Sequence, residues 1–161
     1  MGKEREGSSI TAIDRRILRV LQDDGRTTNQ DIARLVGLSP AACFERVKRL
    51  REKGVIQSYT ALLDPVALDV ALMIFVEVLL DRTNHDVFAA FAGHVQGVPQ
   101  VLECHMVAGG FDYLLKVRVA DMAAYRLFLG DILTAMPGVR ETRTYAVLEE
   151  VKSSTKLPVG A

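Results

Sequence analysis

The sequence predicts an α+β protein made of two parts, a helical N-terminal unit and a C-terminal unit in which strands and helices alternate. Residues 10–54 carry apolar side chains at helical spacing, interrupted by residues that start and stop helices. Residues 71–149 instead alternate between apolar runs typical of strands and helical segments, in the order βαββαβ. Asp64-Pro65 breaks regular structure between the two patterns.

Charge divides the chain near the same point. Residues 1–60 hold 12 Lys or Arg against 8 Asp or Glu, whereas residues 61–161 hold 8 against 12. A basic part joined to an acidic part is typical of a nucleic-acid reader attached to a different module. We therefore expect a DNA-binding domain over residues 10–62, a linker over 63–70 and a second domain over 71–156.

The first two helices are predicted from capping patterns. Thr11 with Asp14 starts the first helix, and Thr28 with Asp31 starts the second. Gly37 ends the second helix, because glycine tolerates the left-handed backbone of a helix stop. The expected buried stripe of the second helix is Ile32, Leu35 and Val36.

A third helix follows within three residues of that stop. Ser39 supplies its N-cap, Pro40 its first turn and Gly54 its end. Its expected apolar stripe is Cys43, Phe44, Val47 and Leu50. The extended segment 55–62 beyond it is predicted to form a wing-like strand or ribbon against the helices.

Two helices joined by so short a turn form a helix-turn-helix unit, whose second helix enters the major groove of DNA. Alanines at the start of the third helix allow close approach, arginines offer forked donors to guanine or phosphate, and lysines suit phosphate. The candidate DNA-binding residues are Ser39, Ala41, Ala42, Glu45, Arg46, Lys48, Arg49 and Lys53. The alternative is a solvated basic face, or a helix pair that serves only packing.

The C-terminal pattern predicts strands over 71–80, 101–107, 111–119 and 139–149, and helices over 86–95 and 122–135. This order favours a ferredoxin-like sheet with both helices on one face. The first strand is apolar at nearly every position except Glu77, so its second face also needs cover. The same sheet of a second copy would supply it, which predicts a homodimer.

The corner Gly109-Gly110 leads directly to Asp112 and places backbone donors beside a carboxylate. Such a set could bind the ammonium and carboxylate groups of an α-amino acid. The alternative is a hairpin in which Asp112 caps the turn. Gly97 and Gly138 are interpreted as ordinary turn residues.

The sequence carries no pattern typical of a metal-binding, membrane, catalytic or RNA-binding protein. Cys43 and Cys104 lie in apolar runs without metal-ligand spacing, so we expect reduced core thiols and no metal. No signal peptide, membrane span or catalytic constellation is found, which indicates a cytoplasmic protein that is not an enzyme and needs no cofactor. RNA binding by the sheet is disfavoured because its strands lack a paired aromatic platform.

Three separated segments carry a family resemblance: GLSPAACFERVKRLREKGVIQSYTALLDP, ECHMVAGGFDYLLKVRVADMAAYR and PGVRETRTYAVLEEVK. Together they resemble the Lrp/AsnC, or feast-famine, family of transcriptional regulators. The resemblance implies a winged helix-turn-helix domain that binds double-stranded DNA and a βαββαβ domain that binds a small amino-acid effector. It further implies dimers that assemble into octamers or similar rings on DNA, in a nucleoid-associated protein.

The resemblance places the effector, leucine or another amino acid, between dimers near the loop before the third strand. It assigns the effector-binding residues as Val107, Ala108, Gly109, Gly110, Asp112, Met122 and Tyr145, with Phe111 inside the same loop. Gly110 stands where many members have an acidic residue, so one partner for the effector's ammonium group is missing. An effector-independent architectural DNA-binding protein stays as the alternative.

Overall fold

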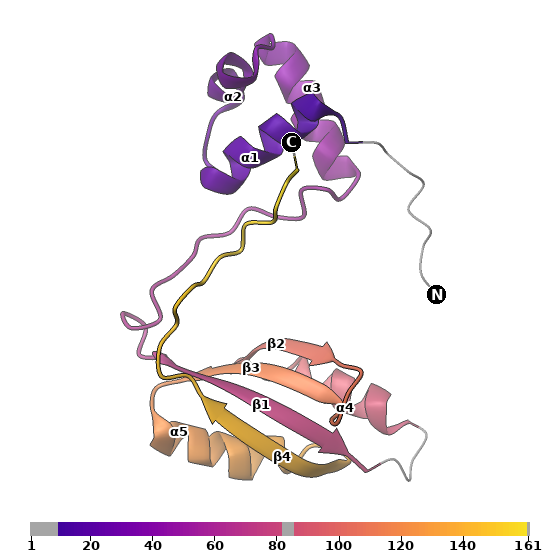
Figure 1. Ribbon diagram of the computed structural model, residues 1–161, viewed down its shortest axis with the longest axis vertical. Coiled ribbons are helices and arrows are strands. Elements are labelled where there is room, and N and C mark those ends of the chain that lie inside the picture. Colours follow the sequence, from indigo (N-terminus) through magenta and orange to yellow (C-terminus); the bar gives the residue numbers. More distant parts are fainter. Residues whose placement is uncertain (1–9, 82–85, 161) are drawn as a thin grey trace. The chain divides into compact units, whose positions relative to one another are not determined.

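The computed structural model describes residues 10–81 and 86–160, and the chain folds as two compact units (Figure 1). One unit contains residues 10–62 together with 153–160, and the other contains residues 63–152.

The first unit contains three helices: α1 (Ala12–Asp23), α2 (Asn29–Val36) and α3 (Pro40–Glu52). Both predicted capping residues, Thr11 and Thr28, accept a hydrogen bond from the backbone N–H of the aspartate three positions later. Gly37 ends α2 with a φ of 75°. A side chain would be strained there, so the tight turn between α2 and α3 depends on glycine.

The core of this unit is smaller than the sequence pattern indicates. Ile17, Ile32, Val36 and Cys43 are buried, together with Val47 and Leu50. The expectation that Leu35 and Phe44 belong to this core was wrong, because they are 57% and 51% exposed. Leu35 precedes buried Val36, and Phe44 follows buried Cys43. One helical step of about 100° turns each of them away from the core.

The expected wing-like strand is not formed in the described chain between α3 and residue 71. Instead, Val55 and Ile56 both donate their backbone N–H to the carbonyl of Leu50, at 2.9 and 3.1 Å. These bonds turn the chain back onto the end of α3. Farther on, the Tyr59 ring lies against Gly25, where an added Cβ would come within 3.1 Å of it.

The C-terminal tail, residues 153–160, lies along α1 within this unit. Gln22 pairs with the backbone of Leu157 in both directions, accepting its N–H at 2.7 Å and donating to its carbonyl at 3.1 Å. Arg19 donates to the carbonyl of Gly160 at 2.9 Å, and Lys156 pairs with Asp23 at 2.6 Å. The last residues therefore belong to the helical unit, whereas the sequence analysis continued the second domain to residue 156.

The second unit contains a four-stranded antiparallel sheet, confirming the βαββαβ prediction. Its elements are β1 (Leu72–Leu80), α4 (Val87–Val95), β2 (Val101–Met106), β3 (Tyr113–Val119), α5 (Met122–Leu127), the π-helical turn η1 (Phe128–Leu133) and β4 (Val139–Ala146). The strand order is β2-β3-β1-β4. The predicted last helix thus splits at Phe128, and the last strand ends three residues earlier than expected.

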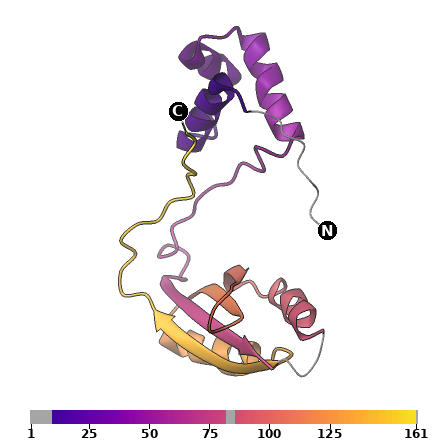
Figure 2. The ribbon, with the colours of Figure 1, turned by 45° about the vertical axis from the view of Figure 1, so that its right-hand side comes forward.

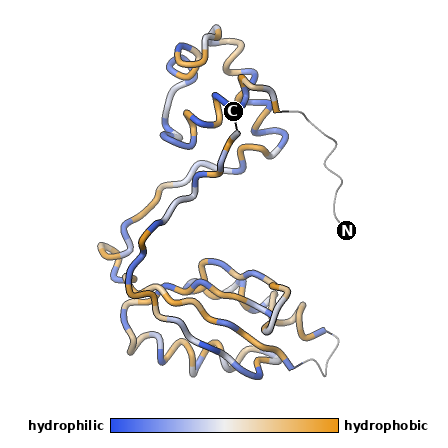
Figure 3. The backbone as a smooth tube through the Cα atoms, viewed as in Figure 1, coloured by the Kyte–Doolittle hydropathy of each residue, from blue (hydrophilic) through white to orange (hydrophobic). Residues whose placement is uncertain are grey.

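Both helices cover one face of this sheet (Figure 2). Alternate residues of β1, such as Ile74 and Val76, pack there against Phe91 of α4 and Tyr125 of α5. Their neighbours in sequence point to the other face, which no helix of this unit covers. Strand β1 is hydrophobic nearly throughout (Figure 3), so the uncovered face includes half-buried apolar side chains.

Gly138 is more than an ordinary turn residue. It has a φ of 74°, and a Cβ at this position would clash with the side chain of Val87, the first residue of α4. Because Val87 is buried in the core, it cannot easily move away. Glycine at 138 therefore allows the start of β4 to approach α4 closely.

Candidate functional site

Helix α3 exposes the residues that the sequence analysis assigned to DNA. Ser39 caps the helix by accepting the backbone N–H of Ala42 at 3.3 Å, and the buried stripe faces the core. The assigned residues all lie off that stripe. Arg46 is half-buried and the others are exposed: Ser39, Ala41, Ala42, Glu45, Lys48, Arg49 and Lys53.

A hollow of about 500 Å³ runs along one flank of α3. Phe44, Lys48 and Arg51 line it from the helix, Asn29 from α2 and Ile56 from the segment that follows α3. It therefore combines apolar side chains, including exposed Phe44, with two cations and the carboxylate of Glu52. Cations at such a rim suit phosphate groups.

The opposite flank carries Arg46 and Arg49, which the sequence analysis expected to face DNA only. Both bind Asp14 of α1: Arg46 Nη1 lies 3.0 Å from its Oδ1, and Arg49 Nη2 lies 3.2 Å from its Oδ2. Burial by itself would raise the pKa of Asp14. Hydrogen bonds from Thr11 and Arg46 and the charge of Arg49 outweigh this effect, so the pKa lies below its usual value. The carboxylate is therefore charged at neutral pH.

The loop from Val107 to Asp112 connects β2 to β3 in the second unit. Val107 donates its N–H to the carbonyl of Asp112 at 3.0 Å, which closes the loop. The buried carboxylate of Asp112 accepts the N–H of Leu80 at 2.8 Å, and the Asp112 N–H donates to Val78 at 3.0 Å. Asp112 thus joins the loop to the end of β1, and its carboxylate points inward rather than into the open loop.

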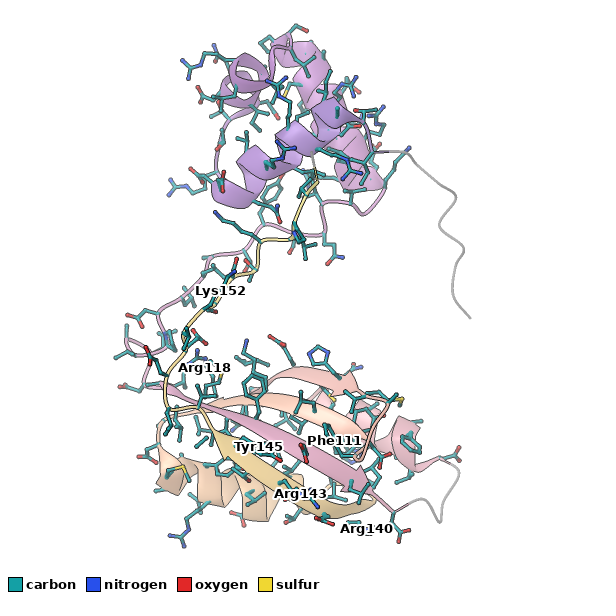
Figure 4. The ribbon with its side chains drawn as sticks, viewed as in Figure 1. Phe111, Arg118, Arg140, Arg143, Tyr145 and Lys152 are labelled. Atoms are coloured by element: carbon teal, nitrogen blue, oxygen red, sulfur yellow. The ribbon has the colours of Figure 1, made fainter. Side chains whose placement is uncertain are left out.

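A pocket of about 250 Å³ lies beside this loop on the uncovered face of the sheet; we call it the sheet pocket. It is lined by Glu77 and Leu79 of β1, Gly110 and Phe111 of the loop, and Glu141 and Arg143 of β4. Figure 4 labels Phe111, Arg143 and neighbouring Tyr145 on this part of the sheet. The strand register explains the grouping, because Glu77 is opposite Arg143 and Leu79 is opposite Glu141.

The sheet pocket brings opposite charges together beside an apolar wall. Arg143 Nε lies 3.2 Å from Glu141 Oε1, and the Tyr145 hydroxyl donates to Glu77 Oε1 at 3.1 Å. This bond to a carboxylate raises the pKa of Tyr145. Two carboxylates, one guanidinium and the apolar side chains of Leu79 and Phe111 match the three parts of a zwitterionic aliphatic amino acid.

The structure brings together only part of the set assigned from the sequence. Gly110 lines the sheet pocket, and Tyr145 contacts it through Glu77. Val107, Ala108, Gly109 and Asp112 belong to the same loop without lining the pocket, and Met122 starts α5, on the helix-covered side of the sheet.

Four residues that line the pocket were not predicted from the sequence: Glu77, Leu79, Glu141 and Arg143. They were detectable only in part. Each pair is spaced by two along a predicted strand and so shares a face. Which two strands are neighbours was not fixed, however, until β1 was found between β3 and β4.

No cluster of metal-ligating side chains occurs among residues 10–81 and 86–160. Within the same residues, no helix has the length and apolar character needed to cross a bilayer.

Comparison with known proteins matches each of the two units to a known domain family. Residues 10–57 match the family model described as winged helix-turn-helix DNA-binding, and residues 73–157 match the Lrp/AsnC ligand binding domain. The chain is 53% identical over 158 residues to the leucine-responsive regulatory protein of Serratia marcescens, covering 98% of this chain and 96% of that protein. The chain belongs to the Lrp/AsnC family. It is therefore a transcriptional regulator with a DNA-binding and an amino-acid-binding domain, and not an enzyme.

Solved Lrp/AsnC structures share the fold. A transcriptional regulator from Neisseria meningitidis, in complex with L-methionine, has a TM-score of 0.89 at 37% identity, covering 92% of this chain and 96% of that one. An AsnC family regulator from Agrobacterium tumefaciens has a TM-score of 0.88 at 34% identity, covering 92% and 97%. The Lrp/AsnC ligand-domain match includes the sheet pocket and the first part of the tail that lies along α1.

Proposed function

We propose that this Lrp/AsnC regulator binds operator DNA sequence-specifically as a homo-oligomer, and that a small aliphatic amino acid changes its assembly or its DNA affinity. The sensing half depends on one observation above all, the sheet pocket, where acidic, basic and apolar side chains meet beside the loop 107–112.

The DNA-binding half is assigned to the exposed residues of α3. Small Ala41 and Ala42 let the start of the helix approach base edges, while Arg46 and Arg49 supply forked donors. Lys48 and Lys53 supply charges for phosphate, aided by Arg51 at the rim of the α3 hollow. Replacing an arginine that binds a base edge should weaken specific binding by about 1–3 kcal/mol.

The effector half is assigned to the sheet pocket. The ligand's ammonium group would lie near Glu77 and Glu141, its carboxylate near Arg143 and the backbone N–H of Gly110, and its side chain on Leu79 and Phe111. Position 110 carries no acidic side chain, and the two strand carboxylates supply the negative charge instead.

Two similar proteins support a choice of effector. The similar Serratia protein is named for its response to leucine, and the similar Neisseria structure holds L-methionine. Both amino acids are unbranched at Cβ and end in an apolar group. We therefore propose leucine or methionine as the effector of this chain.

The uncovered face of the sheet supports the proposed oligomerisation. Half-buried Phe75 and Leu114 lie on that face outside the sheet pocket, and a second sheet packed against them would remove them from water. Two copies would then present two α3 helices to one DNA, and further assembly to an octamer would add more. An amino acid that binds one assembly state better shifts the population of that state and so changes DNA binding.

The test is a thermal-shift series of the full chain against the twenty amino acids, followed by DNA binding with and without those that respond. A ligand that binds the folded chain raises its melting temperature by mass action. Arg143→Gln should abolish the shift, whereas Arg140→Gln, on the same strand but outside the sheet pocket, should retain it. A response to none of the amino acids would leave an effector-independent architectural DNA-binding protein as the better assignment.

A further inference from the structure

Asp14 is a buried carboxylate in α1 that touches α3. It is 1% exposed. Its Oδ2 accepts the Thr11 hydroxyl at 2.7 Å and the Thr11 N–H at 3.1 Å, and these bonds start the helix. The carboxylate also accepts hydrogen bonds from Arg46 and Arg49, which lie more than thirty residues away in the sequence.

The capping role alone does not explain this burial. Thr28 and Asp31 start α2 with the same hydroxyl-to-carboxylate contact, also 2.7 Å long. Asp31 is partly exposed, and its ion pair within the described residues is with Arg34 of its own helix, at 2.8 Å. A helix of this unit can therefore begin without placing its aspartate under the arginines of another helix.

The contacts with Asp14 and Thr11 leave both arginines with unused N–H donors. Arg46 uses only Nη1 and Arg49 only Nη2, and no other partner of these side chains occurs among residues 10–81 and 86–160. Their side chains are 29% and 47% exposed. Because two cations meet one anion, the cluster keeps a positive charge, and each guanidinium keeps further N–H groups for a ligand.

A long surface side chain normally loses rotamer freedom when it binds DNA, and this loss weakens binding. A guanidinium already held by a buried carboxylate has lost that freedom on folding. The same ion pair fixes the plane of the guanidinium, and plane orientation determines which pair of acceptors it can meet.

We propose that Asp14 is a positioning residue for DNA recognition: from α1, it holds the guanidinium groups of Arg46 and Arg49 in one orientation before DNA arrives. This inference rests on the proposed role of α3 in DNA reading. Asp14 itself is buried and does not touch DNA. It acts through the two arginines, and it favours specific over non-specific binding because orientation matters for base edges more than for diffuse phosphate attraction.

The test compares Asp14→Asn with Asp31→Asn in the full chain. Both changes remove one negative charge from a helix-capping aspartate in the same unit, but only the first touches α3. Each variant is titrated, at one salt concentration, with a duplex that the wild-type chain selects from a random pool and with an unrelated duplex of equal length. The ratio of the two affinities should fall about tenfold for Asp14→Asn, the effect of one misoriented base-reading arginine, and less than twofold for Asp31→Asn.

A second arm separates positioning from folding. In a background carrying Arg46→Ala and Arg49→Ala, adding Asp14→Asn should lower the ratio no further. A purely structural role would lower the melting temperature of Asp14→Asn and leave the ratio unchanged, which would overturn the inference. A further fall in the double-alanine background would overturn it too, because Asp14 would then act without the arginines.

Two more outcomes are distinguishable. If the double-alanine variant keeps the wild-type ratio, the proposed reading role of these arginines fails, and the inference fails with it. If Asp14→Asn does not fold, Thr11→Ala replaces it, since Thr11 holds the carboxylate and lies 3.4 Å from Arg46 Nη1. Its ratio should fall about threefold, against no change for the matched cap variant Thr28→Ala, and equal ratios would contradict the inference.

Discussion

Replacing Asp112 by alanine tests whether this carboxylate supports the loop or meets the effector. Its bond to the N–H of Leu80 lies in the protein interior, since Leu80 is 1% exposed and Asp112 is 4% exposed. Alanine would leave that buried donor without its acceptor, which costs about 2 kcal/mol. In a unit of this size the destabilisation corresponds to a fall of about 8–16 °C in the melting temperature.

The assay is urea and thermal unfolding of the full chain, followed by a probe in the C-terminal unit. Asp112→Asn keeps an acceptor oxygen and should lose less, about 1 kcal/mol. Exposed Asp131 lies in the same unit, and Asp131→Ala should stay within about 0.5 kcal/mol of the wild type. If Asp112→Ala unfolded like the wild type and lost only its amino-acid response, the supporting role would be refuted and the sequence interpretation would stand.

Three other predictions concern stability. Gly138→Ala should destabilise the C-terminal unit by about 2–4 kcal/mol in urea unfolding, because it adds backbone strain to a clash in the core. The control Gly130→Ala, whose added Cβ meets nothing within 4 Å, should change the unfolding free energy little. The pKa of Asp14 is lower in the folded chain than its unfolded value of 3.8. The charged carboxylate therefore stabilises the fold fully above pH 3.8, and this stabilisation is lost as pH falls through the folded pKa. Wild type and Asp14→Asn should thus converge in unfolding free energy only below about pH 3.8. Gln22→Ala should release the tail 153–160 from α1 and raise its rate of cleavage by a protease a few-fold. The free energy of unfolding should fall by no more than about 1 kcal/mol, since these hydrogen bonds are exposed. An unchanged cleavage rate would contradict this prediction.

Local signals predicted most of the elements correctly. Thr11, Thr28, Ser39 and Gly37 each start or stop a helix through bonds or backbone angles that involve residues within four positions, so the sequence carries the whole signal. The βαββαβ order followed equally from runs of apolar residues. The prediction failed for the segment 55–62, because a strand needs a partner, and an extended pattern does not supply one.

The functional residues were predicted less completely, for the same reason. The exposed face of α3 follows from helical periodicity, yet the partner of Arg46 and Arg49 is Asp14, which sequence reasoning had assigned wholly to a cap. Asp112 was singled out from the sequence as an effector-binding residue, but its carboxylate accepts the N–H of Leu80 rather than facing the open loop.

Amino-acid order alone was enough to locate the caps of the three N-terminal helices, the succession of strands, the basic face of α3 and the family of regulators to which the chain belongs. Folding in three dimensions was needed to bring Glu77, Glu141 and Arg143 into one pocket, to place a helix-capping aspartate against two arginines of another helix, and to return the tail to α1. The difference is one of range. Caps and periodicity are set by neighbours along the chain, whereas a pocket or a buried ion pair is set by strand order and helix packing, which bring distant residues within hydrogen-bonding distance.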